Sequence, residues 1–248
     1  MVAKVVGWVA IGTVCAVACR PTGIADRVAN RMAAARPSPF PVSAAPRPVD
    51  CRRVKCLALT FDDGPGPETA RLLDMLERRS VRATFFVLGR NAAGAPALLR
   101  RMAAEHHEIA NHGYSHANLV TLSSAEIRRE VSRTQEIVFR ATGRRPKVMR
   151  PPYGATNAKV GRAARLPQIM WQVDTRDWRH RRPGHFRRTV LKLARPGAVI
   201  MAHDTQPSTV DAMPTTMDCL LRRGYTLVTV SELYRGKRLL PGHAYPGR

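Results

Sequence analysis

Apolar residues beyond position 50 fall into short continuous runs, and longer segments of helical periodicity separate these runs. The runs predict strands at 57–61, 81–87, 107–110, 168–173, 197–202 and 225–229. The amphipathic segments predict helices at 67–79, 94–104, 123–140, 156–165, 183–194 and 209–223. This alternation of strand and helix predicts an α/β fold built on a mostly parallel sheet that is closed or nearly closed.

The N-terminal segment has a different pattern. An uncharged apolar run from Val5 to Ala18 follows Lys4, which predicts an export signal over residues 1–19. A helix of about 15 residues would reach only about 22 Å, less than the roughly 30 Å of a bilayer core. The residues before Cys19 resemble a bacterial lipoprotein cleavage box, so Cys19 is a candidate site of lipid attachment as an alternative to simple cleavage.

The next stretch, residues 20–50, is rich in Pro, Ala and Arg and lacks apolar periodicity. It predicts a disordered, extended linker. We therefore expect one exported domain over residues 51–235 and a C-terminal tail over 236–248. The domain would be either secreted or tethered to the outer face of the cell membrane through the N-terminal segment.

The chain is strongly basic, with a formal net charge of +23 over 248 residues. Such a charge fits a solvated, arginine-rich surface, and it also raises a polyanionic partner, either a nucleic acid or an acidic surface. No recognition helix, zinc-finger spacing or aromatic RNA-binding run accompanies the charge, so we expect no specific nucleic-acid partner. An anionic cell-envelope polymer fits the composition better.

Two cysteines flank a short basic turn before the first predicted strand, Cys51 and Cys56. Export would place them in an oxidising compartment, where disulfides form and persist. We expect a disulfide that closes this small loop.

Paired carboxylates end the first predicted strand. Asp62 and Asp63 follow its apolar residues, and Gly64 and Pro65 then turn the chain away. Neighbouring side chains on extended backbone point to opposite sides, so one acid could bind a cation while the other acts as a base. Taken alone, the run also fits a solvated acidic turn.

Two histidines, His112 and His116, follow the third predicted strand at a spacing of four residues. One helical turn would place both imidazoles on one face, where they could bind a common ion. Two histidines and a carboxylate such as Asp63, with open positions for water and substrate, fit zinc or another divalent transition metal.

Three further groups of polar residues occur at the ends of predicted strands or in rigid turns. They are the run Met149 to Gly154, the run Asp174 to Trp178, and the pair His203 and Asp204. Each alone also fits a turn, a surface acid cluster or a capped strand. Together they indicate one site, because parallel strands bring their carboxyl ends to the same edge.

In order along the chain, the motifs TFDDGP, HxxxH, RPPYG, DxxDW and a strand ending in HD resemble the polysaccharide deacetylase family, the NodB-homology or carbohydrate esterase family 4. The resemblance covers residues 54–234. It implies a distorted (β/α)7 barrel and the metal-dependent removal of acetyl groups from N-acetylated sugars.

The resemblance also implies roles for the residues around the metal. The metal ligands would be Asp63, His112 and His116, and the catalytic base would be Asp62. Arg150 would pair with this base and hold it ionised.

Other roles concern the intermediate and the leaving group. The backbone N–H of Tyr153 would stabilise the oxyanion, His203 would act as the general acid, and Asp177 would orient His203. The residues expected to line the substrate and its acetyl methyl are Pro152, Tyr153, Trp178 and Met201. Met201 stands where the family usually has Leu. The resemblance gives no role to Asp174 or Asp204.

The expected function is thus that of a monomeric, exported hydrolase that removes N-acetyl groups from N-acetylglucosamine in a cell-wall glycan, with peptidoglycan as the first choice. We expect one divalent metal ion, zinc before cobalt, nickel or manganese. Chitin deacetylase and acetyl-xylan esterase activities are alternatives with the same chemistry. A non-catalytic glycan-binding module or a basic nucleic-acid binder is disfavoured, because neither a ligand nor the base is missing.

Overall fold

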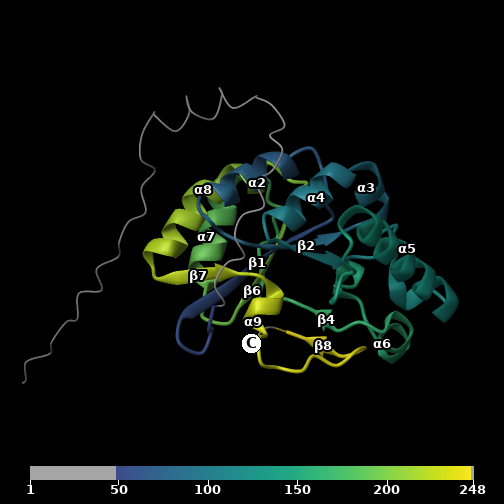
Figure 1. The fold of residues 1–248 in the computed structure, drawn as a ribbon. Coiled ribbons are helices and arrows are strands. Elements are labelled where there is room, and N and C mark those ends of the chain that lie inside the picture. Colours follow the sequence, from purple (N-terminus) through teal and green to yellow (C-terminus); the bar gives the residue numbers. More distant parts are fainter. Residues whose placement is uncertain (1–48, 247–248) are drawn as a thin grey trace, which may run out of the picture. The chain divides into compact units, whose positions relative to one another are not determined.

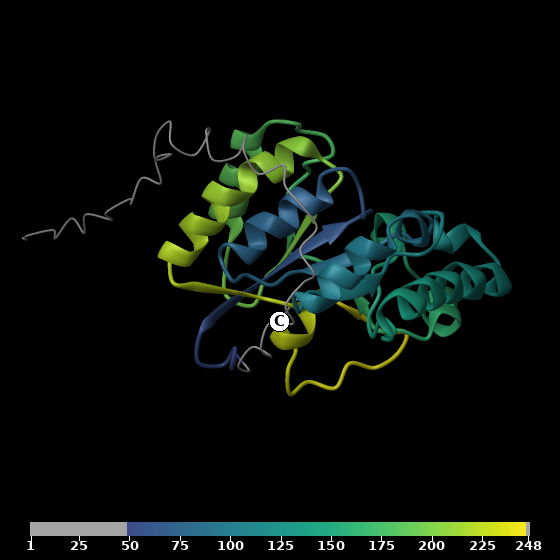
Figure 2. The ribbon, with the colours of Figure 1, turned by 45° about the horizontal axis from the view of Figure 1, so that its top comes forward.

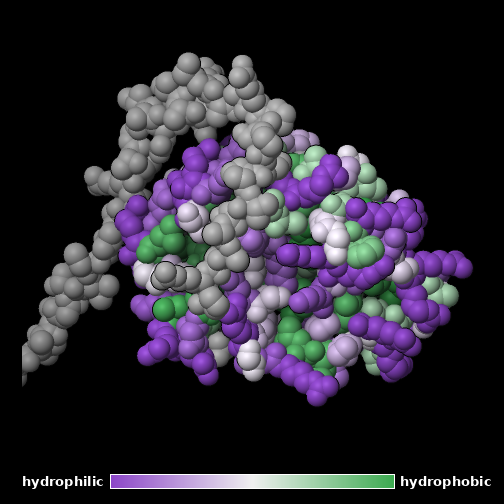
Figure 3. All heavy atoms as spheres, viewed as in Figure 1, coloured by the Kyte–Doolittle hydropathy of each residue, from purple (hydrophilic) through white to green (hydrophobic). Residues whose placement is uncertain are grey.

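The computed structural model describes residues 49–246 of the chain. The predicted export signal, Cys19 and all but the end of the predicted linker lie outside the described residues. Within residues 49–246, none of the helices combines the length and the apolar character needed to cross a membrane. Figure 3 shows hydrophilic residues spread widely over the face that it presents.

Six parallel strands form the central sheet, in the order β3-β2-β1-β6-β5 with β7 paired to β1 (Figure 1). Their bounds are β1 Lys55–Asp62, β2 Thr84–Val87, β3 Glu108–Asn111, β5 Val173–Asp174, β6 Val199–His203 and β7 Tyr225–Val228. The strand β1 pairs with three others, β2, β6 and β7. It therefore lies at the centre of the sheet.

Single bridges extend the pairing beyond β3. Met149 pairs in parallel with Asn111 on one side and with Gln168 on the other. Gln168 belongs to β4 (Gln168–Ile169), and β5 begins a few residues later on the same segment. The pairings thus lead from β3 through Met149 to the segment 168–174 and on to β6, which agrees with the expected sheet that is closed or nearly closed.

Two details of the sheet differ from the sequence prediction. The single strand expected at 168–173 consists of two short strands, β4 and β5. In the predicted tail, β8 (Ala244–Tyr245) pairs in parallel with β4. The end of the chain is thus hydrogen-bonded to the fold.

Helices flank the sheet (Figures 1 and 2), and within residues 49–246 six of them lie at the predicted amphipathic segments, whereas two short ones, Gly89–Gly94 and Val230–Leu233, were not predicted. Their bounds are α2 Thr69–Glu77, α3 Gly89–Gly94, α4 Pro96–Ala104, α5 Ser124–Thr142, α6 Ala158–Ala164, α7 Pro183–Leu193, α8 Pro207–Arg222 and α9 Val230–Leu233. Short 3₁₀ turns occur at Leu119–Thr121 and Pro152–Gly154. The helices α2, α7 and α8 lie together on one flank, and α5 and α6 lie on another (Figure 1).

The longest helix, α5, shows why its boundaries lie where they do. Ser123 accepts a hydrogen bond from the N–H of Glu126, and the Glu126 side chain accepts one from the N–H of Ser123. This reciprocal capping satisfies two amide donors that a helix leaves unpaired at its start. Gly143, with φ of 71°, ends the helix in a left-handed conformation that glycine adopts without strain.

Side chains of β1 enter two separate hydrophobic clusters. Leu57, Leu59 and Phe61 lie in the larger cluster, whereas Cys56 and Ala58 lie in the second. This alternation follows from the two-residue period of a strand that is buried on both faces. The core on both sides therefore fixes the register of β1, and with it the position of the acidic residues at its end.

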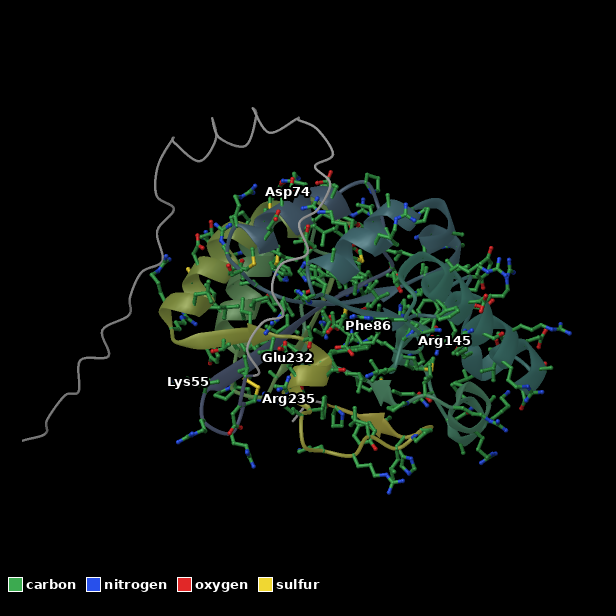
Figure 4. The ribbon with its side chains drawn as sticks, viewed as in Figure 1. Lys55, Asp74, Phe86, Arg145, Glu232 and Arg235 are labelled. Carbon is green, nitrogen blue, oxygen red and sulfur yellow. A yellow bond between two sulfur atoms is a disulfide. The ribbon has the colours of Figure 1, made fainter. Side chains whose placement is uncertain are left out.

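Just before β1, Cys51 and Cys56 form a disulfide. Figure 4 shows it near Lys55, at the beginning of the strand. The loop that it closes lies at the opposite end of β1 from Asp62.

Candidate active site

The two adjacent acids, Asp62 and Asp63, diverge because the chain turns between them. β1 ends at Asp62, and Asp63 has a left-handed backbone with φ of 74°. The expectation that both lie on extended backbone is therefore wrong, although the two carboxylates do have different partners. Asp is one of the few residues that tolerate this conformation. The next residue must be Gly64, because a Cβ there would lie 2.3 Å from Oδ2 of Asp204.

A group of possible metal ligands surrounds Asp63. Its Oδ1 atom lies 3.4 Å from Nε2 of His112 and 3.4 Å from Nε2 of His116. One donor atom from each of the three residues lies within 4.8 Å of the others. Asp63 Oδ1 is buried and has no hydrogen-bond partner among the described residues, which is unusual for a buried carboxylate oxygen. An unsatisfied carboxylate beside two imidazole nitrogens fits a divalent cation.

The hydrogen bonds of His112 favour the tautomer that a metal requires. Its Nδ1 atom lies 2.7 Å from the backbone oxygen of Arg150. A carbonyl oxygen only accepts, so Nδ1 carries the proton and Nε2 keeps a free lone pair on the side of Asp63. Burial, the largest influence, lowers the pKa of His116 and so favours its neutral form as well.

The two histidines meet through a loop, which corrects the expectation of a helical turn. His112 directly follows β3, and the residues up to Asn118 form no helix. Gly113 has φ of 79° and His116 has φ of 65°, so two of the five residues from His112 to His116 have left-handed backbone. Backbone of this kind is costly for a non-glycine residue and persists where the surrounding structure holds it.

The support for this histidine loop comes from α5. One oxygen of Glu130 accepts hydrogen bonds from the N–H groups of Tyr114 and Ser115, at 2.9 and 2.8 Å. The hydroxyl of Thr134 donates to the oxygen of Gly113 at 2.8 Å. A role for Glu130 or Thr134 was not predicted from the sequence. Their signal is weak, because they are single polar side chains on an amphipathic helix.

The carboxylate of Asp62 is paired with Arg150, which is fully buried. Nη1 of Arg150 donates to Oδ1 of Asp62 at 2.7 Å and to the hydroxyl of Thr60 at 2.8 Å. The remaining nitrogens donate to the backbone oxygens of Ile169 and Met170. Four such contacts fix the guanidinium beside the buried carboxylate of Asp62.

The ring of Phe86 on β2, a residue labelled in Figure 4, lies against the same guanidinium group. The Cζ atom of Arg150 lies 4.1 Å from the centre of the Phe86 ring. This cation–π contact gives the buried Arg150 side chain a second favourable partner.

His203 and Asp177 form the second charged pair. Nδ1 of His203 lies 2.7 Å from Oδ1 of Asp177, and Oδ2 of Asp177 accepts from the Thr209 hydroxyl at 2.7 Å. Burial alone would lower the pKa of His203. The hydrogen bond and charge of Asp177, with further help from Asp62 and Asp63, outweigh burial and raise the pKa of His203 to about 9.

The two pairs face each other across adjacent strands. Asp62 and His203 are Cα partners in the β1/β6 register, and Nε2 of His203 lies 3.9 Å from Oδ2 of Asp63. A carboxylate and a protonated imidazole thus both lie beside the metal-ligand group. This arrangement can take a proton from one side of a reacting group and give one to the other.

The expected substrate-contacting residues are placed unequally. Tyr153 has φ of 61°, and its ring lies 4.5 Å from that of His116. Met201 is buried two residues before His203 on β6, so both side chains point to the same face of the strand. Trp178 is 53% exposed and is tied to the site through its backbone N–H, which donates to Asp177. A methyl pocket formed by these residues and the buried Pro152 remains a prediction.

Asp204, which has no role assigned from the family resemblance, links two parts of the site. It is fully buried, and its Oδ2 accepts from the hydroxyl of Thr69, which in turn accepts from the N–H of Gly66. This chain of hydrogen bonds ties the loop after Asp63 to the end of β6. Burial, with a contribution from Asp63, raises the pKa of Asp204 to about 7 despite the hydrogen bond from Thr69.

Asp174, the other residue without an assigned role, lies at the surface side of the same region. Its Oδ1 accepts from the backbone N–H of Arg176 at 2.9 Å. Its contacts are those of a turn, and they do not reach the metal-ligand group.

Comparison with known proteins gives consistent results. A sequence model described as polysaccharide deacetylase matches residues 50–169. The peptidoglycan-N-acetylglucosamine deacetylase PgdA of Listeria monocytogenes is 42% identical over 192 residues, which cover 77% of this chain and 41% of that protein. A chitooligosaccharide deacetylase of Bradyrhizobium sp. is 38% identical over 210 residues, covering 75% of this chain and 93% of that protein. The chain therefore spans less than half the length of PgdA.

Solved structures extend the similarity to the fold. A structure described as T48 deacetylase with substrate is 45% identical and has a TM-score of 0.78, covering 79% of this chain and 99% of the other.

Proposed function

The chain belongs to the polysaccharide deacetylase family, and from this premise we propose that it hydrolyses the acetamido group of N-acetylglucosamine in a cell-wall glycan, with peptidoglycan as the expected substrate. The observation that carries the proposal is the placement of both Asp62 and His203 beside the metal-ligand group. Hydrolysis of an amide needs both a base for the water and an acid for the amine.

The same premise supports a more specific description of the fold. Besides the two-residue β8, seven segments of residues 49–246 contribute to the parallel pairings: β1, β2, β3, Met149, residues 168–174, β6 and β7. We propose that they are the seven strands of a distorted (β/α)7 barrel of the NodB-homology type, in which Met149 stands for a strand reduced to one residue.

Asp63, His112 and His116 would hold one divalent cation, with zinc as the first choice and cobalt, nickel or manganese as alternatives. When bound, the cation would lower the pKa of a water molecule and polarise the acetyl carbonyl. The unsatisfied Oδ1 of Asp63 and the free Nε2 of His112 support this assignment.

Asp62 would take the proton of the attacking water. Its two oxygens have different surroundings, because Oδ1 accepts from Arg150 while Oδ2 lies 4.0 Å from Nε2 of His112. Oδ2 is therefore the oxygen that faces the reaction. Arg150 holds the carboxylate in position.

His203 would protonate the departing sugar amine from Nε2. Its Nδ1 is held by Asp177, and its pKa of about 9 keeps the imidazole protonated at neutral pH. Tyr153 would supply a backbone N–H to the oxyanion. The next two N–H groups, of Gly154 and Ala155, are used within the turn itself.

Location and assembly complete the proposal. We propose export, on the apolar N-terminal run followed by a Pro-rich stretch, and a monomeric enzyme that acts outside the membrane. Chitin deacetylase and acetyl-xylan esterase activities use the same groups, so only the substrate separates them.

The test is a panel of substrates offered to the zinc-loaded full chain, with acetate release as the readout. Peptidoglycan fragments, chitooligosaccharides and acetylated xylan should rank in that order. Asp63→Asn should lose zinc and activity together, whereas Asp62→Asn should keep zinc and lose turnover. No acetate from any of the three would refute the activity, and an inverted order would refute the substrate.

A further inference from the structure

A concave region is formed by residues that follow Asp177 and Trp178 in the chain. It is a hollow of about 440 Å³. The residues that line it are Arg179, His180, Arg181, Arg182, His185 and Arg188. Every lining side chain is a permanent cation or an imidazole that can become one. Such a lining selects for an anion.

The positive charge of this basic hollow is uncompensated. Residues 178–195 contain seven Lys and Arg and no Asp or Glu. The four lining arginines form no ion pair with a carboxylate within residues 49–246. Other arginines do find such partners: Arg79 pairs with Asp218 and Arg101 with Glu105. Gathering like charges without a counter-ion is unfavourable, so the arrangement favours a ligand that supplies one.

The local structure shapes the hollow around the start of α7. Arg188 folds back over the first turn of this helix, where its Nη1 lies 3.4 Å from the position of a Cβ on Gly184. The rings of His180 and His185 lie 4.2 Å apart. The helix dipole adds partial positive charge at the same place. Guanidinium groups also present paired donors that match the oxygens of phosphate.

These features separate phosphate from other anions. A single carboxylate would neutralise one of several neighbouring cations, whereas a phosphate group offers more charge and more acceptor oxygens. A nucleic acid would be expected to need a longer basic track with aromatic rings for stacking. The hollow is compact, and no Phe, Tyr or Trp lines it.

We propose that the basic hollow binds a phosphate monoester or diester group attached to an anionic wall polymer, and that it holds the polymer beside the active site. Holding the polymer beside the active site rests on the proposed function, because the neighbouring glycan is the substrate only if the chain is a deacetylase. Asp177, Trp178 and Arg179 are consecutive in the chain, so a phosphate bound at Arg179 would lie near Asp177.

The test compares two double variants with equal loss of charge, Arg181→Gln/Arg182→Gln and a control, Arg128→Gln/Arg129→Gln, on the exposed face of α5. The zinc-loaded full chain is titrated by calorimetry with glucose 6-phosphate as the monoester and poly(glycerol phosphate) as the diester. We expect binding of at least one probe, a loss of tenfold or more in the first variant, and less than a twofold change in the control. Whichever probe binds more tightly identifies the monoester or the diester as the ligand.

Equal weakening in both variants, or no binding of either probe, would overturn the proposal. Tighter binding of a single-stranded oligonucleotide than of poly(glycerol phosphate) at the same number of phosphates would overturn it in favour of a nucleic-acid site. Acetate release from a neutral chitooligosaccharide should be unchanged in Arg181→Gln/Arg182→Gln. Because binding is measured without turnover, failure here is distinguishable from failure of the proposed activity.

A second readout places the phosphate within the hollow. Burial and then the positive charges of His185, Arg179 and Arg176 lower the pKa of His180. A bound phosphate should raise the pKa of the His180 imidazole, as followed by NMR. An unchanged His180 titration with saturating probe would place the bound phosphate elsewhere, for example at the metal, and would overturn the proposal.

Discussion

Nδ1 of His203 lies 2.7 Å from Oδ1 of Asp177, a carboxylate with no exposed surface. Burial would raise the pKa of Asp177, but its hydrogen bonds with His203 and Thr209 outweigh burial and keep the pKa below its usual value of 3.8. The same contact raises the pKa of His203 to about 9. Both shifts favour the charged pair.

Asp177→Asn should therefore lower the pKa of His203, because an amide gives neither the charge nor the same hydrogen bond. The alkaline limb of the profile of kcat/KM against pH should move to lower pH, and kcat should fall by about 10²-fold or more. Asp174→Asn is a matched control, since Asp174 contacts only the nearby turn. An alkaline limb that stays in place in Asp177→Asn would contradict this role.

The same pair affects stability in a defined direction. The folded-state pKa of His203 lies above its ordinary value of 6.5, so the stabilisation is fully present below about pH 6.5 and is lost as pH rises through about 9. Urea unfolding of the chelator-treated protein should show this decline between pH 6.5 and 9. Asp177→Asn should flatten it.

Arg150→Met should destabilise the protein by about 3–5 kcal/mol, because it leaves the buried carboxylate of Asp62 without its partner. The backbone oxygens of Ile169 and Met170 would also lose their donors. Arg78→Met, at the exposed C-cap position of α2, should change the free energy of unfolding by less than about 0.5 kcal/mol. Denaturant unfolding measures both, and equal effects would argue against a special role for the buried pair.

Glu130→Ala should weaken zinc binding by about 10–100-fold while the fold remains intact, because Glu130 holds the loop between His112 and His116. Competition with a chelator measures the affinity. Glu136→Ala on the same helix removes an exposed carboxylate that pairs only with Arg140 and Arg145, and it should leave zinc affinity unchanged. If both variants bound zinc normally, the loop would not depend on α5.

Asp204→Asn should change how stability depends on pH. The folded-state pKa of Asp204 is about 7, whereas the ordinary pKa of an aspartate is 3.8. This residue therefore makes the protein less stable as pH rises from about 4 to 7. The full effect would be up to about 4 kcal/mol. The variant should therefore lose less stability over this range, measured by urea unfolding after chelation. Asp211→Asn, at an exposed position of α8, should keep the wild-type slope.

The sequence predicted the order of strands and helices well because long hydrophobic runs and amphipathic segments report burial directly. Leu57, Leu59 and Phe61 had to enter a core, which fixed β1 and its acidic end. By contrast, β8 consists of two residues, Ala244 and Tyr245, too few to show any periodicity. Its existence depends on pairing with β4, which is a tertiary effect.

The geometry of the candidate site was predicted only in part. The residue types of Asp63, His112 and His116 indicated a metal, but their spacing suggested a helical turn where the structure has a loop. Left-handed backbone at Asp63 and His116 has no signature in residue type, since neither is glycine. The supporting Glu130 comes from a distant helix, so only the folded structure reveals it.

The triple pairing of β1 gives the two halves of the metal-ligand group different mobility. Amides of β1 should exchange with solvent only when the whole protein unfolds, because opening them would break contacts with β2, β6 and β7. The loop from His112 to His116 depends on a few side-chain contacts from α5 and should open far more often. On heating, the protein should therefore release its metal by local opening of this loop while β1, which ends at Asp62 directly before Asp63, is still intact. Inactivation by a chelator should precede the loss of secondary structure.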